Sequence, residues 1–129
     1  MLAVDTNIVV RYLTDDHPEQ SPKARVLIQN NDIFVSRTVL LESEWVLRAL
    51  YDFDRARIAD ELLAFAGLPE VTIEDSTGSL NALRWFKNGL DFADVMHLVS
   101  ATGCDAFVSF DKRLVKAAVR IEALAVRSP

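Results

Sequence analysis

Residues 91–111, DFADVMHLVSATGCDAFVSFD, indicate how this chain folds. The stretch predicts a helix over 92–102, a turn at Gly103 where that helix ends, and an apolar strand over 106–110. Asp111 then begins a last helix. A strand between two helices is typical of α/β proteins, in which helices connect the strands of a largely parallel sheet.

The rest of the chain repeats this alternation of apolar strands and helices. We expect strands over 2–4, 33–35, 71–73 and 124–126, and helices over 6–13, 21–30, 38–51, 54–67, 77–87 and 111–119. Ser21 and Pro22 predict a helix that starts with a serine cap followed by proline at the first helical position. The sequence therefore predicts a single domain over residues 1–129, of class α/β, with 71–73 as an edge strand.

The composition fits one cytoplasmic domain. The chain has 129 residues, of which 50% are hydrophobic, enough for a sizeable core. It contains no apolar run of about 18 residues that would span a membrane, and its first residues do not resemble a secretory signal. The single Cys104 cannot form a disulfide within the chain, which favours a reducing compartment. We expect Cys104 to be a core residue without a functional role.

The net charge restricts how the protein can bind nucleic acid. Fourteen basic residues stand against 19 acidic ones, so the formal charge is −5. This balance argues against a protein that holds nucleic acid by bulk electrostatic attraction. It is compatible with an enzyme that meets phosphate groups through a bound metal ion, and with a basic protein partner.

Two aspartates follow predicted strands directly. Asp5 comes after the strand 2–4, and Asp111 comes after the strand 106–110. Ligand sites of parallel α/β sheets form outside the carboxyl ends of the strands, so the two acids would lie close together if their strands are neighbours. The alternative is that each aspartate only caps the helix that it opens.

Helical geometry separates Glu42 from Glu44. Two residues apart on a helix, they lie about 200° apart and cannot serve one site. Glu44 precedes Arg48 by four residues, the favourable spacing for an ion pair, and we expect it on the solvated surface. Glu42 shares its face with apolar residues such as Trp45 and Val46, where a carboxylate is costly unless it is paired or bound to metal.

Asp94 lies on an apolar helix face in the same way. It shares that face with Leu98 and small residues, whereas Asp91 is the natural cap of the helix. Asp94 could also serve only to complement the helix dipole. His97 lies near this face, where a lone histidine is more often a packing residue than a ligand.

Together, Asp5, Glu42, Asp94 and Asp111 predict a site for a hard divalent cation. Converging carboxylates without cations raise each other's pKa values, and Mg²⁺ or Mn²⁺, which prefer oxygen ligands, relieve this repulsion. Such a site suits phosphoryl chemistry, because the metal lowers the pKa of a bound water and polarises the phosphate. The sequence contains neither a glycine-rich phosphate loop nor a Ser-His-Asp set in a fitting context.

The same segments resemble a known family. The motifs are Asp5-Thr6-Asn7, Leu41-Glu42 followed by Trp45-Val46-Leu47, Asp91-Phe92-Ala93-Asp94 followed by His97-Leu98, and Ser109-Phe110-Asp111. In this order, over about 1–127, they resemble PIN-domain proteins, specifically the VapC-type toxins of type II toxin–antitoxin pairs. The family more often has threonine where Ser109 stands, but both residues carry a hydroxyl group.

The resemblance implies a fold, an activity and partners. The fold is a three-layer α/β/α domain with a short, largely parallel sheet, and the activity is that of a Mg²⁺- or Mn²⁺-dependent endoribonuclease. Asp5, Glu42, Asp94 and Asp111 would be the catalytic and metal-binding acids. The supporting residues would be Thr6, Asn7, Asp91 and Ser109. The partners would be RNA, a cognate antitoxin and a second copy of the chain in a homodimer. The resemblance leaves open the RNA that is cleaved, the number of metal ions, and whether Asp91 or Asp111 is the closer metal contact.

Two other functions have to be distinguished from this one. The first is a phosphatase with Asp5 as its nucleophile, but that chemistry usually needs a second acid two residues later, where this chain has Asn7. The second is a catalytically inactive PIN fold that only binds a partner. Basic side chains that could meet an RNA backbone, or that only form solvated helix surface, are Arg11, Arg84, Lys87, Lys112, Arg113 and Lys116.

Overall fold

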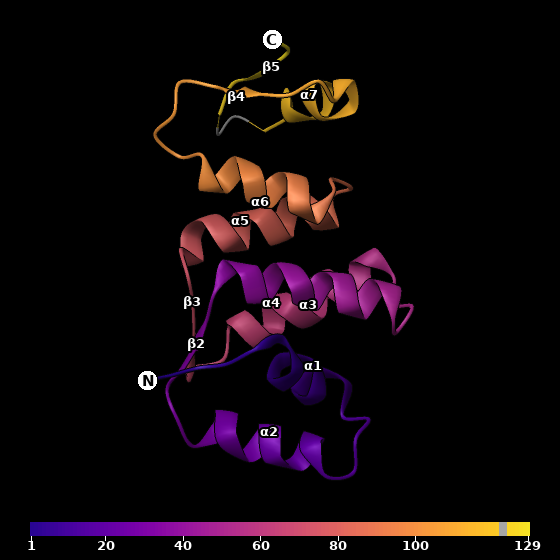
Figure 1. Cartoon of the computed structure of the whole chain (residues 1–129), viewed down its shortest axis with the longest axis vertical. Coiled ribbons are helices and arrows are strands. Elements are labelled where there is room, and N and C mark those ends of the chain that lie inside the picture. Colours follow the sequence, from indigo (N-terminus) through magenta and orange to yellow (C-terminus); the bar gives the residue numbers. More distant parts are fainter. Residues whose placement is uncertain (122–123) are drawn as a thin grey trace.

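The computed structural model describes residues 1–121 and 124–129, and it contains a short parallel sheet along one side of the molecule (Figure 1). The strands are β1 (Leu2–Ala3), β2 (Ile33–Val35) and β3 (Val71–Ile73), in the order β1-β2-β3. All pairs are parallel, with Leu2 opposite Ile33 and Ile33 opposite Val71. Ile33 and Val35 on the central strand are fully buried, as expected for a strand covered by helices. The predicted edge position of β3 is confirmed.

The described residues form seven helices. They are α1 (Thr6–Thr14), α2 (Gln20–Gln29), α3 (Arg37–Ala49), α4 (Arg55–Ala66), α5 (Ser76–Lys87), α6 (Phe92–Ser100) and α7 (Lys112–Ala118). Asp54, Asp91 and Asp111 cap their helices as predicted. The predicted α/β fold class is therefore confirmed. None of the described helices has the length and apolar character that crossing a membrane would require.

The predicted start of α2 is wrong by two residues. The helix begins at Gln20 and follows Glu19, so that Ser21 lies inside the first turn. Ser21 is fully buried, and its hydroxyl accepts a hydrogen bond from the backbone N–H of His17. Pro22 is still tolerated, because the first turn of a helix does not need its N–H groups.

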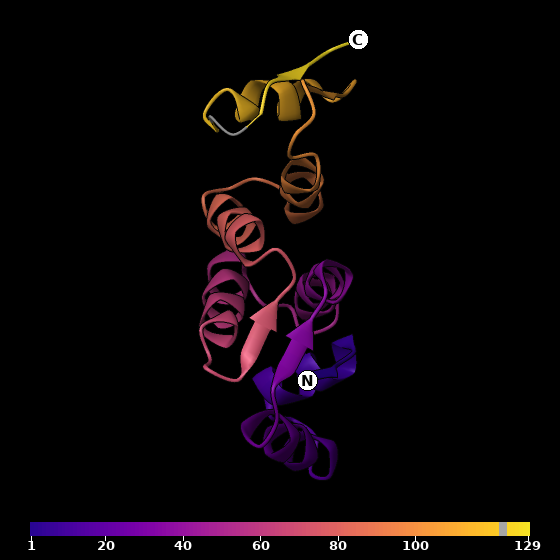
Figure 2. The same cartoon turned by 90° about the vertical axis from the view of Figure 1, so that its left-hand side faces the viewer.

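The hydrophobic core has a large and a small part. The large part lies around the three-stranded sheet and helices α1 to α6 and includes Phe65 and Phe92. The small part consists of Leu98, Leu114 and Ile121. Figures 1 and 2 show α7 with the last two strands at one end of the molecule, beyond α6 and away from the sheet.

The strand predicted over 106–110 is shorter than expected and lies in a second sheet. It is reduced to β4 (Phe107–Val108), which pairs in parallel with β5 (Val126–Arg127). Phe110, which follows β4, is 87% exposed. The prediction of a strand in this apolar segment is confirmed, but its length is not. The small core beside β4 is not large enough to bury a strand of five residues. As a result, Asp5 and Asp111 follow strands of different sheets.

Candidate active site

The N-terminal part of the site joins the start of α1 to the middle of α3. Asp5 follows β1 and caps α1, accepting a hydrogen bond from the backbone N–H of Ile8 at 3.2 Å. The next residue, Thr6, is buried, and its hydroxyl donates a hydrogen bond to the carboxylate of Glu42. This contact fixes Glu42 beside the carboxyl end of β1, although its own helix starts from β2.

The C-terminal part of the site brings three aspartates to one cavity. Asp91, Asp94 and Asp111 line a cavity of about 390 Å³ between α6 and α7. Asp91 accepts a hydrogen bond from the backbone N–H of Asp94 at 3.1 Å, and Asp111 accepts one from that of Arg113 at 2.9 Å. Each cap uses one oxygen of a carboxylate that has two, so capping and metal binding are compatible. The sequence alone leaves capping and ligand binding as alternatives, and the geometry permits both.

The charges in this cavity interact. Burial raises the pKa of Asp94, and the negative charges of Asp91 and Asp111 raise it further, while His97 acts in the opposite direction. Repulsion between carboxylates is the physical reason to expect a metal in this site, and the raised pKa of Asp94 reflects such repulsion from Asp91 and Asp111.

Asp91 connects the two parts of the site. It lines a second cavity, of about 340 Å³, together with Glu42 and Trp45. Its negative charge also contributes to raising the pKa of Arg48, after the larger effect of Glu44. Asp5 and Asn7 line a third cavity, between α1 and α2.

The chemical type of these side chains suits a hard cation, but their spacing in the described part of the chain does not form a complete metal site. Carboxylate oxygens are the ligands that Mg²⁺ and Mn²⁺ prefer. In residues 1–121 and 124–129, however, no three His, Cys, Asp or Glu side chains are close enough together to hold a metal ion. The structure thus brings Asp91, Asp94 and Asp111 to one cavity and attaches Glu42 to Thr6, but does not gather all four predicted acids.

The sequence matches the PIN domain family over residues 2–120. The chain belongs to the PIN domain family. Neither the curated proteins nor the solved structures that were searched gave a match. PIN domains are generally nucleases that use divalent metals, so membership gives this chain a nuclease-type fold.

Within the PIN domain, Ser109 and Asp111 are linked directly. The Ser109 hydroxyl accepts a hydrogen bond from the backbone N–H of Asp111 at 3.0 Å. This contact stabilises the turn between β4 and α7, which places the carboxylate of Asp111 at the cavity of the aspartates. The hydroxyl is the feature that Ser109 shares with threonine.

The predicted environments of Glu42 and Glu44 are wrong. Glu44 is 3% exposed, whereas Glu42 is exposed apart from its contact with Thr6. The reason is that α3 buries the face that carries Leu40 and Leu47, and Glu44 lies on that face. The predicted ion pair is confirmed, with Arg48 Nε at 2.9 Å from the Glu44 carboxylate. Glu42 therefore owes its role as a site candidate to Thr6 and not to an apolar surrounding.

Two arginines lie close to the acids, and of these the sequence indicates Arg113 but not Arg55. Arg55 and Arg113 both line the cavity of the three aspartates. Arg55 is held by the carbonyl oxygens of Phe86 and Leu90, at 2.8 and 2.6 Å. Arg113 is exposed and carries its charge at the cavity rim. Arg113 follows Asp111 by two residues, whereas Arg55 reaches the acids from α4, so spacing along the sequence does not reveal its place.

The other basic candidates differ in their surroundings. Arg11 donates hydrogen bonds to Gln20, Asp16 and Tyr51, and this network ties the last turn of α1 to the start of α2 and to the loop after α3. Lys87 pairs with Asp60 across α4 and α5. On α7, Lys112 and Lys116 are exposed like Arg113.

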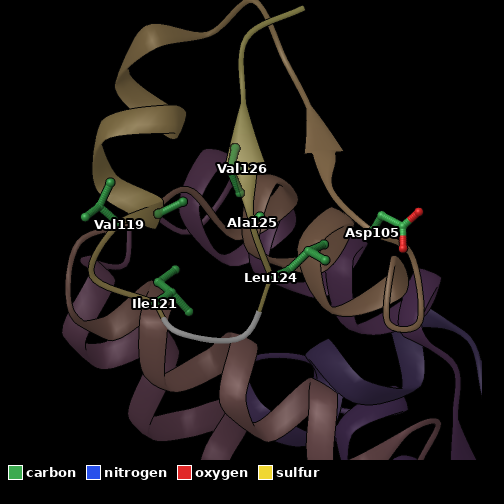
Figure 3. Close-up of a pocket in the computed structure, with 7 residues that line it drawn as sticks. Asp105, Val119, Ile121, Leu124, Ala125 and Val126 are labelled. Carbon is green, nitrogen blue, oxygen red and sulfur yellow. The ribbon is translucent and has the colours of Figure 1, made fainter.

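The cavity at the C-terminal end of the molecule lies apart from the predicted site. It has a volume of about 560 Å³ and is lined by Val119, Ile121, Leu124 and Val126, with Asp105 as its charged residue (Figure 3). None of the predicted acids lines it. Cys104, next to Asp105, is exposed, so the prediction that it is a core residue is wrong.

Proposed function

We propose that this PIN domain protein is a Mg²⁺- or Mn²⁺-dependent endoribonuclease that acts as the toxin of a toxin–antitoxin pair. The observation that carries the proposal is the cavity shared by Asp91, Asp94 and Asp111, in which neighbouring negative charges raise the pKa of Asp94. The three carboxylates outnumber the two arginines, Arg55 and Arg113, that line the same cavity, so its charge favours a divalent cation over a free phosphate.

The residues of the chain have separate tasks in this proposal. Asp94 and Asp111 would hold the cation, Asp91 would contact it or orient Asp94, and Glu42 and Asp5 would complete the site from the opposite part. When bound, the cation supplies a water of lowered pKa and polarises the phosphate. Thr6 keeps the Glu42 carboxylate in place, and Ser109 holds the turn before Asp111. Arg113 at the rim offers a positive charge to the RNA backbone.

The cellular role and the partners depend on the resemblance to VapC-type toxins. It supports an antitoxin protein that holds the enzyme inactive, a homodimer and a cytoplasmic location. The exposed basic residues of α7, Lys112, Arg113 and Lys116, give the otherwise acidic protein a local surface for RNA phosphates.

An inactive PIN fold that only binds a partner is the second candidate. The observation that favours it is that the described acids do not form a metal cluster of three or more ligands. The two functions differ in whether purified protein cuts RNA. The phosphatase alternative would instead require a phosphoenzyme at Asp5.

The test is cleavage of end-labelled single-stranded RNA and total tRNA by purified, antitoxin-free protein. We expect discrete cuts in Mg²⁺ or Mn²⁺, none in EDTA, and products without cyclic phosphate ends, because water is the nucleophile. Cuts that persist in EDTA and leave cyclic phosphates would come from attack by the RNA 2′-hydroxyl, and would contradict the proposal. The absence of cleavage under all conditions would favour the partner-binding function.

A further inference from the structure

An exposed tryptophan lies next to the candidate active site. Trp45 on α3 is 52% exposed, although an aromatic side chain of this size is usually largely buried. It lines the cavity of about 340 Å³ that also contains Glu42 and Asp91. Leu41 and Ala93 add apolar surface to the same cavity. A flat aromatic surface is therefore open to a ligand beside two of the site acids.

The charges of this cavity restrict what can occupy it. Its charged residues are Glu42, Glu44, Asp91 and Arg48. Arg48 is paired with Glu44 at 2.9 Å, so Glu42 and Asp91 leave the cavity negative. Such a cavity repels a phosphate group or an acidic peptide. It accepts a neutral planar group, and a nucleobase is the neutral planar part of the substrate proposed above.

We infer that Trp45 stacks on an unpaired nucleobase of the RNA, adjacent to the phosphodiester that is cut. This inference rests on the proposed ribonuclease function and adds to it the side chain that holds a base of the substrate. A base in this cavity is next to Glu42 and Asp91, and the neighbouring phosphate would meet these acids only through the cation that they help to hold in the proposed function. Bases within a duplex are already stacked and do not reach a side chain in this way.

The direct test is the fluorescence of Trp45. The chain has two tryptophans, so Trp85→Phe leaves Trp45 as the only reporter. In that background, Asp94→Asn prevents cleavage, and a short oligoadenylate is titrated in Mg²⁺, alone and annealed to its complement. Stacking predicts saturable quenching by the single strand and little by the duplex. An unchanged signal with a single strand that binds in a filter assay would overturn the inference.

The second readout is affinity and cleavage by variants of Trp45. Loss of one stacked base weakens binding by about fivefold to a hundredfold, so Trp45→Ala should bind the single strand that much more weakly and Trp45→Phe should recover most of the loss. Leu50→Ala, which removes another exposed apolar side chain of the same region, is the matched control and should bind normally.

The outcomes separate this inference from the proposed function. Wild-type protein that cuts RNA, together with Trp45→Ala that binds and cuts equally well, leaves the ribonuclease in place and overturns the role of Trp45. A change of oligomeric state in Trp45→Ala with unchanged RNA affinity assigns the side chain to self-association and also overturns it. Wild-type protein that cuts no RNA contradicts the proposed function, whereas quenching by the single strand still reports on the cavity.

Discussion

Thr6 and Glu42, separated by 36 positions in the sequence, are joined by a hydrogen bond between the threonine hydroxyl and the glutamate carboxylate. Thr6 is 6% exposed and lies at the start of α1, directly after the candidate acid Asp5. The contact links the carboxyl end of β1 to the middle of α3. It is the structural reason for regarding Asp5 and Glu42 as parts of one site.

Replacing Thr6 by valine tests this link. Valine keeps the shape of the side chain but removes the hydroxyl, so Glu42 loses its fixed position. Loss of a residue that orients a metal ligand typically reduces metal affinity or activity by about 10- to 100-fold. We expect a loss of this size in cleavage rate for Thr6→Val and a near-normal rate for Thr6→Ser. Equal rates for both variants would show that the hydrogen bond has no role in the reaction.

The pKa of Asp94 gives a prediction for stability without metal. Because its folded-state pKa lies above the ordinary value, ionised Asp94 opposes folding. This cost is absent at pH values below the unfolded pKa of about 3.9 and fully present above the raised pKa of the folded state. Asp94→Asn should therefore raise the melting temperature in EDTA at pH 7, and the gain should disappear at low pH. A variant that is less stable than wild type at pH 7 would contradict this.

Metal binding should reverse the effect of the acids on wild-type stability. A cation that binds only the folded state raises the melting temperature, and the shift grows with the ratio of its concentration to its Kd. We expect Mg²⁺ or Mn²⁺ to stabilise wild type and to have a much smaller effect on Asp94→Asn, measured by thermal unfolding at constant ionic strength. Equal shifts in the two proteins would place the bound cation elsewhere.

The ion pair of Glu44 and Arg48 is structural, and its loss should affect folding. The Glu44 side chain is 4% exposed, so Arg48→Ala leaves a buried carboxylate without its partner. We expect the free energy of unfolding to fall by about 2 kcal/mol, measured by urea denaturation. Lys87→Ala breaks the pair with Asp60, whose two side chains are 46% and 60% exposed, and should cost less than about 1 kcal/mol. Similar losses for both variants would argue against a buried pair.

The order of elements was predictable because local signals decide it. Asp54, Asp91 and Asp111 mark helix starts by a mechanism that depends only on neighbouring backbone N–H groups. The first three strands are apolar runs between such helices, and all three were placed correctly. The start of α2 was misplaced because the side chain of Ser21 bonds to the backbone of His17 and does not cap the helix.

The tertiary surroundings were less predictable. Both faces of α3 carry apolar residues, so the sequence did not indicate that Glu44 would be buried and Trp45 exposed. The pairing of β4 with β5, and not with β1, depends on contacts between distant segments. The same applies to Arg55, which reaches the cavity of the aspartates from α4.

The central claim is that acids from both parts of the molecule serve one metal-dependent site. The most direct measurement is RNA cleavage in Mg²⁺ by Asp5→Asn, Glu42→Gln, Asp94→Asn and Asp111→Asn, each compared with wild type and with Asp105→Asn as an exposed acid outside the site. We predict that all four lose at least about a hundredfold in rate while keeping a folded far-UV circular dichroism spectrum, and that Asp105→Asn cuts normally. Full activity in Asp5→Asn or in Asp111→Asn would contradict a single shared site.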